Sequence, residues 1–120
     1  MPMSVYYARE HGFDGTPESQ LKAIILEALL RLNFIILRIN SGGRNNAPAV
    51  LWYLPPEITA RRAGVMDIFC VSPEGRPYWI DTKATTKPSD AQLEFAAAME
   101  ARGIICLFPR SLEELLIEIQ

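Results

Sequence analysis

The fold is decided by residues 66–83, which read MDIFCVSPEGRPYWIDTK. Two apolar runs rich in β-forming residues flank a turn sequence, so this stretch predicts a β-hairpin with strands at Met66–Ser72 and Pro77–Lys83. In the intervening SPEG at residues 72–75, proline suits the second position of a type I turn and glycine suits a position of positive φ. We therefore predict a tight loop that pairs residue 72 with residue 76.

This loop also fixes which residues face each other across the hairpin. With residue 72 opposite residue 76, Asp67 lies opposite Asp81, and both side chains point to the same face. Lys83, two residues beyond Asp81, lies on that face as well. A loop one residue longer would shift the register and separate the carboxylates.

Two carboxylates and a lysine at one end of a hairpin suit the hydrolysis of a phosphodiester. Carboxylate oxygens bind a hard divalent cation, and a lysine can lie beside the attacking water and the phosphate. Asp67 and Asp81 interrupt strands in which aspartate is depleted, so a purely structural role explains them poorly. An edge hairpin whose charges are merely solvated remains the alternative on these residues alone.

Helix signals occur at three further places. Residues 16–17 supply an N-cap threonine and a first-turn proline. The spacing that follows predicts one buried helical face, formed by Leu21, Ile24, Ile25, Ala28, Leu29 and Leu32. SDAQ at residues 89–92 and SLEE at residues 111–114 are capping boxes of two later helices, the first of which ends at Gly103.

The remaining strands complete an α/β order. Phe34–Leu37 predicts a strand that ends near Asn40, and Ile104–Phe108 predicts another. Residues 41–63 are rich in glycine and proline and predict a long loop, with room for a brief strand at residues 50–54. The order αβββαβα, with a helical crossover before the last strand, predicts a mixed sheet flanked by helices.

Composition sets the class of protein. The chain has 120 residues, 49% apolar and 22% charged, as expected of one soluble globular domain. We assign residues 1–15 to an N-terminal extension and residues 16–120 to the domain. No apolar run reaches the roughly 20 residues of a membrane span, and the N-terminus lacks the features of a signal peptide. Cys70 and Cys106 fall in predicted strands as buried free thiols, which favours a reducing cytoplasm.

Charge is unevenly distributed along the chain. The net charge of −2 argues superficially against nucleic acid. Residues 38–87, however, carry seven bases and four acids, a local charge of +3, whereas residues 88–120 carry two bases and six acids, a local charge of −4. The basic half contains the candidate carboxylates, and a bound cation would offset their charge further. Chance variation of a solvated surface is the alternative explanation.

Six short motifs follow one another at compatible spacings. They are PESQL at 17–21, LRINSGG at 37–43, Gly64-x-x-Asp67-Ile68, Asp81-Thr82-Lys83, SDAQ at 89–92 and ARG at 101–103. In this order they resemble a stand-alone VRR-NUC domain of the PD-(D/E)xK nuclease superfamily, over residues 16–118. Met66 departs from the usual proline, and Asp81 replaces the usual glutamate. The resemblance implies a restriction-endonuclease-like αβββαβ core.

The resemblance also implies a role for each matching residue. The ligands of Mg²⁺ or Mn²⁺ would be Glu18, Asp67, Asp81 and the backbone carbonyl of Thr82. Lys83 would orient the attacking water and stabilise charge on the phosphate, and Gln92 would be a polar residue at the site. Structural explanations compete with these roles, and for Lys83 the explanation is that a lysine at a strand end is commonplace. Glu18 suits the dipole of a first helical turn, and Gln92 suits the capping box.

The activity implied by the resemblance is that of a metal-dependent deoxyribonuclease without an organic cofactor. Its substrate would be branched or structured DNA, such as a Holliday junction or a flap, and a homodimer would present two sites. It would act in the cytoplasm of a bacterial or phage-infected cell, in DNA repair or replication. DNA contacts are expected from Arg38, Asn40, Ser41, Gly42, Arg44, Arg61, Arg62 and Lys87.

Two other functions stay open at this point. One is a DNA-binding or scaffold subunit with a degenerate site, against which the intact carboxylates and lysine argue. The other is a restriction-type or flap nuclease that needs partner subunits, although the sequence contains no separate recognition module. Trp52 and Tyr53 could stack on unpaired bases, but packing against the core or a second subunit is favoured. His11, the only histidine, is predicted to be a surface residue.

Overall fold

A computed structural model describes residues 15–39, 54–58 and 64–120. Its elements follow in the order α2 (Pro17–Arg31), β1 (Ile35–Arg38), β2 (Ile68–Val71), β3 (Pro77–Ile80), α3 (Asp90–Glu100), β4 (Ile105–Leu107) and α4 (Leu112–Glu118). This is the predicted αβββαβα order. Of the long loop predicted at 41–63, only residues 54–58 are described. The brief strand predicted at 50–54 therefore lies outside the described residues except for Leu54.

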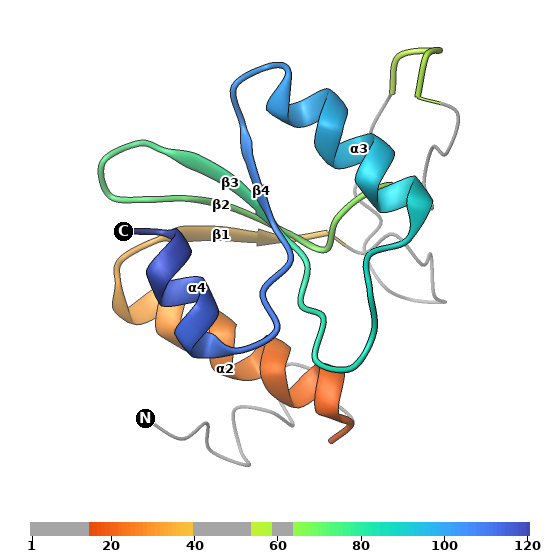
Figure 1. The fold of residues 1–120 in the computed structure, drawn as a ribbon. Coiled ribbons are helices and arrows are strands. Elements are labelled where there is room, and N and C mark those ends of the chain that lie inside the picture. Colours follow the sequence, from red (N-terminus) through yellow and green to blue (C-terminus); the bar gives the residue numbers. More distant parts are fainter. Residues whose placement is uncertain (1–14, 40–53, 59–63) are drawn as a thin grey trace, which may run out of the picture.

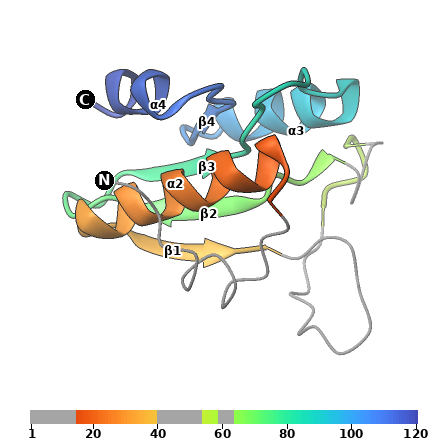
Figure 2. The same cartoon turned by 90° about the horizontal axis from the view of Figure 1, so that it is seen from below.

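The strands form one mixed sheet in the order β1-β2-β3-β4. The first three strands are antiparallel neighbours, and β4 pairs in parallel with β3 after the crossover through α3. In Figure 1, α2 and α4 lie together on one side of the sheet and α3 lies on the other. Figure 2 shows the strands side by side, with α2 crossing in front of them. The predicted mixed sheet flanked by helices is confirmed.

Each face of the sheet has its own apolar core. The larger core packs α2 and α4 against side chains such as Ile68, Cys70, Tyr78 and Ile80, all with almost no exposed surface. The smaller core packs Phe95 of α3 against the opposite face, where its ring meets Trp79 edge-on at 5.3 Å between centroids. Because successive side chains along β2 and β3 point to opposite faces of the sheet, these strands contribute to both cores.

The hairpin has the predicted loop and register. The Ser72 amide donates to the Arg76 carbonyl at 2.9 Å, and Gly75 has a φ of 88°. Ile68 pairs with Ile80 and Cys70 with Tyr78, which places residue 67 opposite residue 81.

At this end of the hairpin both strands are shorter than predicted: β2 begins at Ile68 rather than at Met66, and β3 ends at Ile80 rather than at Lys83. Beyond this point the contact between the two segments is made by a side chain: the Asp67 amide donates to the Asp81 carboxylate at 3.2 Å. The two aspartates consequently lie just beyond the paired strands.

The predicted N-caps are present, although the box predicted at residues 111–114 has only the bond from the Glu114 amide to Ser111. The Thr16 hydroxyl accepts from the Ser19 amide and begins α2, and the Ser111 hydroxyl accepts from the Glu114 amide and begins α4. The box at residues 89–92 is complete in both directions. These local bonds set where α2 and α3 begin, and both helices contribute side chains to the candidate site.

The buried face of α2 was predicted only in part. Leu21, Ile25 and Leu29 are buried, but Leu32 lies past the end of the helix and is 44% exposed. Ala23 and Leu26 are buried instead of Ile24 and Ala28, because α2 packs against both β1 and α4. The buried surface of α2 is therefore wider than the single helical face that the spacing predicts, and it is rotated away from that face.

Two expectations about the class of protein concern membrane spans and cysteines. Within the part of the chain that the structure describes, no helix is long and apolar enough to cross a membrane. Cys70 is a fully buried free thiol as predicted, whereas Cys106 is only half-buried. Burial raises the pKa of both thiols to about 12, and Glu100 adds to the rise at Cys106.

Candidate active site

The candidate site lies at the end of the sheet where β2 begins and β3 ends. Asp67 precedes β2 and Asp81 follows β3, so the two carboxylates meet across the hairpin. Beyond Asp81, the chain stays extended beside the segment that follows β4, with the Asp81 and Lys83 amides donating to Leu107 and Pro109 at 3.0 Å. This pairing holds Asp81 and Lys83 at alternate positions of the segment that directly follows β3.

Asp81 is the most connected residue of the site. One carboxylate oxygen, Oδ2, accepts from the Asp67 amide at 3.2 Å and from Gln92 Nε2 at 3.0 Å. The other, Oδ1, lies 3.4 Å from Lys83 Nζ, and both side chains are 14% exposed. Burial raises the pKa of the Asp81 carboxyl, the Asp67 charge raises it further, and Lys83 opposes the rise.

Gln92 makes both of the contacts that the sequence suggests, one to the helix cap and one to the candidate site. Its side-chain oxygen accepts from the Ser89 amide at 3.1 Å, which completes the capping box. Its side-chain nitrogen donates to Asp81. The helix cap therefore orients the Gln92 side chain so that its nitrogen reaches the Asp81 carboxylate.

Gly64 permits the close approach of α3 to the chain before Asp67. A Cβ built at Gly64 would lie 2.3 Å from the Ala91 carbonyl oxygen and 2.8 Å from its carbon. Real Cβ atoms do not approach backbone so closely, so only glycine fits here without movement. Since Ala91 directly precedes Gln92, this contact helps to set the position of Gln92. The sequence marked Gly64 as part of a motif but gave no physical reason for it.

Lys22 of α2 is a site residue that the sequence analysis missed. Its ammonium forms an ion pair with Asp67 Oδ2, and both side chains are 21% exposed. The available signal was its spacing, because Lys22 follows Glu18 by four residues and so shares its helical face. The partner, Asp67, lies far away in sequence and could not be inferred from that spacing.

Glu18 approaches the site through the segment after β3. Its Oε1 accepts from the Thr85 amide at 3.1 Å and from the Thr86 hydroxyl at 3.2 Å. Burial raises the pKa of Glu18, but the hydrogen bonds from Thr85, Ala84 and Thr86 outweigh it, so the pKa is lowered overall. Glu18 thus connects the start of α2 to the residues following Lys83, and its role as a metal ligand stays a prediction.

The predicted DNA-binding residues are only partly within the described chain. Arg38 ends β1 opposite Ile68, so it lies at the same end of the sheet as Asp67. Lys87 lies in the segment before α3. The other predicted contacts lie outside the described residues; they are Asn40, Ser41, Gly42, Arg44, Arg61 and Arg62.

The carboxylates fit a divalent cation of the Mg²⁺ type. Among residues 15–39, 54–58 and 64–120, no three side chains of histidine, cysteine, aspartate or glutamate gather as a ready-made metal cage. Mg²⁺ is usually bound through one or two carboxylates, with waters and substrate phosphates as further ligands. Asp67 and Asp81 supply such a pair, and their mutual repulsion is what a cation would relieve. Thr82, which is 4% exposed, follows directly and could add its backbone carbonyl.

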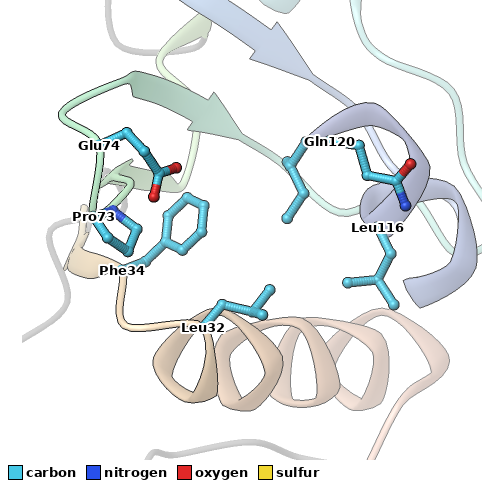
Figure 3. Close-up of a pocket in the computed structure, with 7 residues that line it drawn as sticks. Leu32, Phe34, Pro73, Glu74, Leu116 and Gln120 are labelled. Atoms are coloured by element: carbon cyan, nitrogen blue, oxygen red, sulfur yellow. The ribbon is translucent and has the colours of Figure 1, made fainter.

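A hollow of about 380 Å³ lies elsewhere, at the turn end of the hairpin. Figure 3 shows Leu32, Phe34 and Leu116 around it, with Pro73 and Glu74 from the turn. The carboxylates lie at the opposite end of β2 and β3. We place the candidate site at the carboxylates, because charged and polar side chains from several elements meet there.

Comparison with known proteins supports the architecture. A solved structure described as a VRR_NUC domain resembles this chain with a TM-score of 0.58 and 19% sequence identity. The similarity covers 87% of this chain and 97% of that one. No protein-family model and no curated protein matches the sequence. The predicted restriction-endonuclease-like α/β fold of the VRR-NUC type is therefore confirmed at the level of structure.

Proposed function

We propose that this protein is a metal-dependent DNA endonuclease that hydrolyses phosphodiester bonds in branched or structured DNA. The observation that carries the proposal is that Asp67, Asp81 and Lys83 lie together. Gln92 also donates a hydrogen bond to the Asp81 carboxylate. The structural similarity to a VRR_NUC domain supports it.

In this proposal, Asp67, Asp81 and the Thr82 carbonyl hold Mg²⁺ or Mn²⁺, with Glu18 as a further ligand. The bound ion would polarise the phosphate and lower the pKa of the attacking water. Lys83 is held beside Asp81, 3.4 Å from its Oδ1, where its charge can meet negative charge that develops on the phosphate oxygens. Gln92 keeps the Asp81 carboxylate oriented through its 3.0 Å hydrogen bond.

The DNA-binding surface in this proposal is the basic part of the chain around the carboxylates. Arg38 and Lys87 are its members within the described residues; Arg44, Arg61 and Arg62, which lie outside them, are expected to contribute by their charge alone. Contacts from such residues go mainly to phosphates, which favours recognition of DNA shape over sequence. A junction, a flap or another branch would then be selected by geometry.

A homodimer is the assembly we propose. Its support is the edge strand β1, where Ile35 is 72% and Leu37 is 57% exposed. Exposed apolar edge strands are open to pairing with another chain. Light scattering of the wild type and of Ile35→Lys tests this, because a dimer through β1 predicts that only the wild type is dimeric. A monomeric wild type at working concentration would contradict it.

The test of function is incubation of the purified protein with Holliday-junction, flap, single-stranded and duplex DNA. Each substrate is combined with Mg²⁺, Mn²⁺ or chelator. We expect cleavage of a branched substrate that requires either metal and leaves a 5′-phosphate. Tight binding of DNA without cleavage under every condition would instead indicate a scaffold subunit. Two free cysteines are compatible with the cytoplasmic location that we propose for this activity.

A further inference from the structure

Lys22 occupies a position that conflicts with the metal site. Its ammonium contacts Oδ2 of Asp67, one of the two carboxylates that would hold the cation. An ammonium has no lone pair, so it cannot share in ligating a metal, and its positive charge repels one nearby. A divalent cation at Asp67 and the Lys22 contact are therefore in competition.

Lys22 and Lys83 are not equivalent in this respect. Lys83 lies two residues from its partner in the same segment after β3 and is 14% exposed. Lys22 comes from a different element, α2, and is 21% exposed at the end of a flexible side chain. Because long ammonium side chains keep contact with water, Lys22 can leave Asp67 without disturbing the strands that hold the carboxylates.

We propose that Lys22 is a competing cation: it neutralises Asp67 in the metal-free protein and is displaced when a divalent cation binds. This inference rests on the proposed function, because it assumes that Asp67 and Asp81 are the metal ligands. In addition, Lys22 lowers the affinity of the site for the metal, and it offsets the repulsion between Asp67 and Asp81 before the metal binds. Lys22 is thus a positioning residue whose role is measurable without DNA.

The experiment is a calorimetric titration of the metal-free protein with Mn²⁺ at low salt. Lys22→Met removes the charge but keeps an unbranched, helix-compatible side chain. It should bind Mn²⁺ about two- to fivefold more tightly than wild type, the range expected from removing a partly exposed ion pair. Lys22→Arg keeps the charge and should bind as the wild type does.

Arg31→Met is the matched control. Arg31 is nine residues further along α2, about 13 Å away, and forms a more exposed ion pair with Glu27 at 3.3 Å within the same helix. This variant loses the same charge but should leave Mn²⁺ affinity unchanged. An equal gain in Arg31→Met and Lys22→Met would mean general electrostatics and would overturn the inference.

Thermal unfolding provides a second readout. Without metal, Lys22→Met should unfold below the wild type, since Asp67 and Asp81 then repel each other with one cation fewer. Saturating Mn²⁺ should close that gap, because metal stabilises the variant more. If Lys22→Met binds Mn²⁺ equally or more weakly, the inference fails while the metal site stands. If the wild type and all variants fail to bind Mn²⁺, or Asp67→Asn binds as wild type does, the proposed metal site itself fails.

Discussion

Replacing Gly64 with alanine should separate the positioning of the site from the stability of the fold. The added Cβ would lie 2.3 Å from the Ala91 carbonyl oxygen, whereas ordinary contacts begin about 1 Å further out. Because the obstructing atom is backbone at the first turn of α3, the helix start must move by a comparable distance. Overpacking of this kind costs about 1–3 kcal/mol, which lowers the unfolding temperature by roughly 4–12 °C.

The effect on cleavage follows from the residue next to Ala91. Gln92 donates to Asp81 at 3.0 Å, and a shift of about 1 Å breaks that bond. Misplacement of this size in an active site costs about 10²-fold in rate. We therefore expect single-turnover cleavage by Gly64→Ala at saturating Mg²⁺ to fall about a hundredfold.

Gly75→Ala is the control for lost stability. Gly75 has a φ of 88° in the hairpin turn, and nothing lies within 4 Å of a Cβ built there. Alanine at that φ costs about 1–2 kcal/mol of backbone strain, so the two variants lose stability of the same order. Only Gly64→Ala should lose cleavage. A folded Gly64→Ala protein that cleaves within about threefold of wild type would refute the positioning role of this contact.

Three further predictions concern Lys83, the DNA-binding surface and Glu118. Lys83→Ala should retain Mn²⁺ binding but lose about 10²–10³-fold in single-turnover cleavage, and a loss under about threefold would remove Lys83 from the mechanism. Affinity for DNA, measured with Ca²⁺ in place of Mg²⁺, should fall steeply as the salt concentration rises. The double variant Arg38→Ala, Lys87→Ala should reduce the slope of log affinity against log salt concentration by about 1.8. An unchanged slope would exclude both residues as phosphate contacts. Burial, then the Glu114 charge and hydrogen bond, raise the pKa of Glu118 above 4.5 in the folded protein, so its contribution to stability is present below pH 4.5 and is lost as pH rises through the folded value. Glu118→Gln should therefore unfold at a higher temperature than wild type at pH 7 and at a similar one at pH 4, and the reverse order would contradict this sign.

The parts of the molecule that were predicted correctly are set by local chemistry. The SPEG turn determines the register of the hairpin, and this register alone was enough to predict Asp67 opposite Asp81. Capping residues such as Thr16 and Ser89 likewise mark the starts of α2 and α3. These features depend on residues a few positions apart, which a single sequence displays directly.

The parts that were missed depend on contacts between distant segments. Lys22 meets Asp67 and Gly64 meets Ala91 only after the helices have docked on the sheet. The buried face of α2 was partly wrong for the same reason, because α4 covers a second side of the helix that periodicity alone does not reveal. Local spacing showed that Lys22 lies on one helical face with Glu18, but not which side chain it would meet.

Whether Asp67 and Asp81 hold the catalytic metal decides between a nuclease and a structural protein. The decisive measurement is single-turnover cleavage of a branched DNA by the wild type, Asp67→Asn and Asp81→Asn across a Mg²⁺ titration, with folding checked by thermal unfolding. We expect both variants to remain folded, to bind Mn²⁺ far more weakly and to cleave at least about 10³-fold more slowly, a loss of about 4 kcal/mol of transition-state stabilisation. Cleavage by either variant near the wild-type rate at saturating Mg²⁺ would contradict the assignment of these two carboxylates.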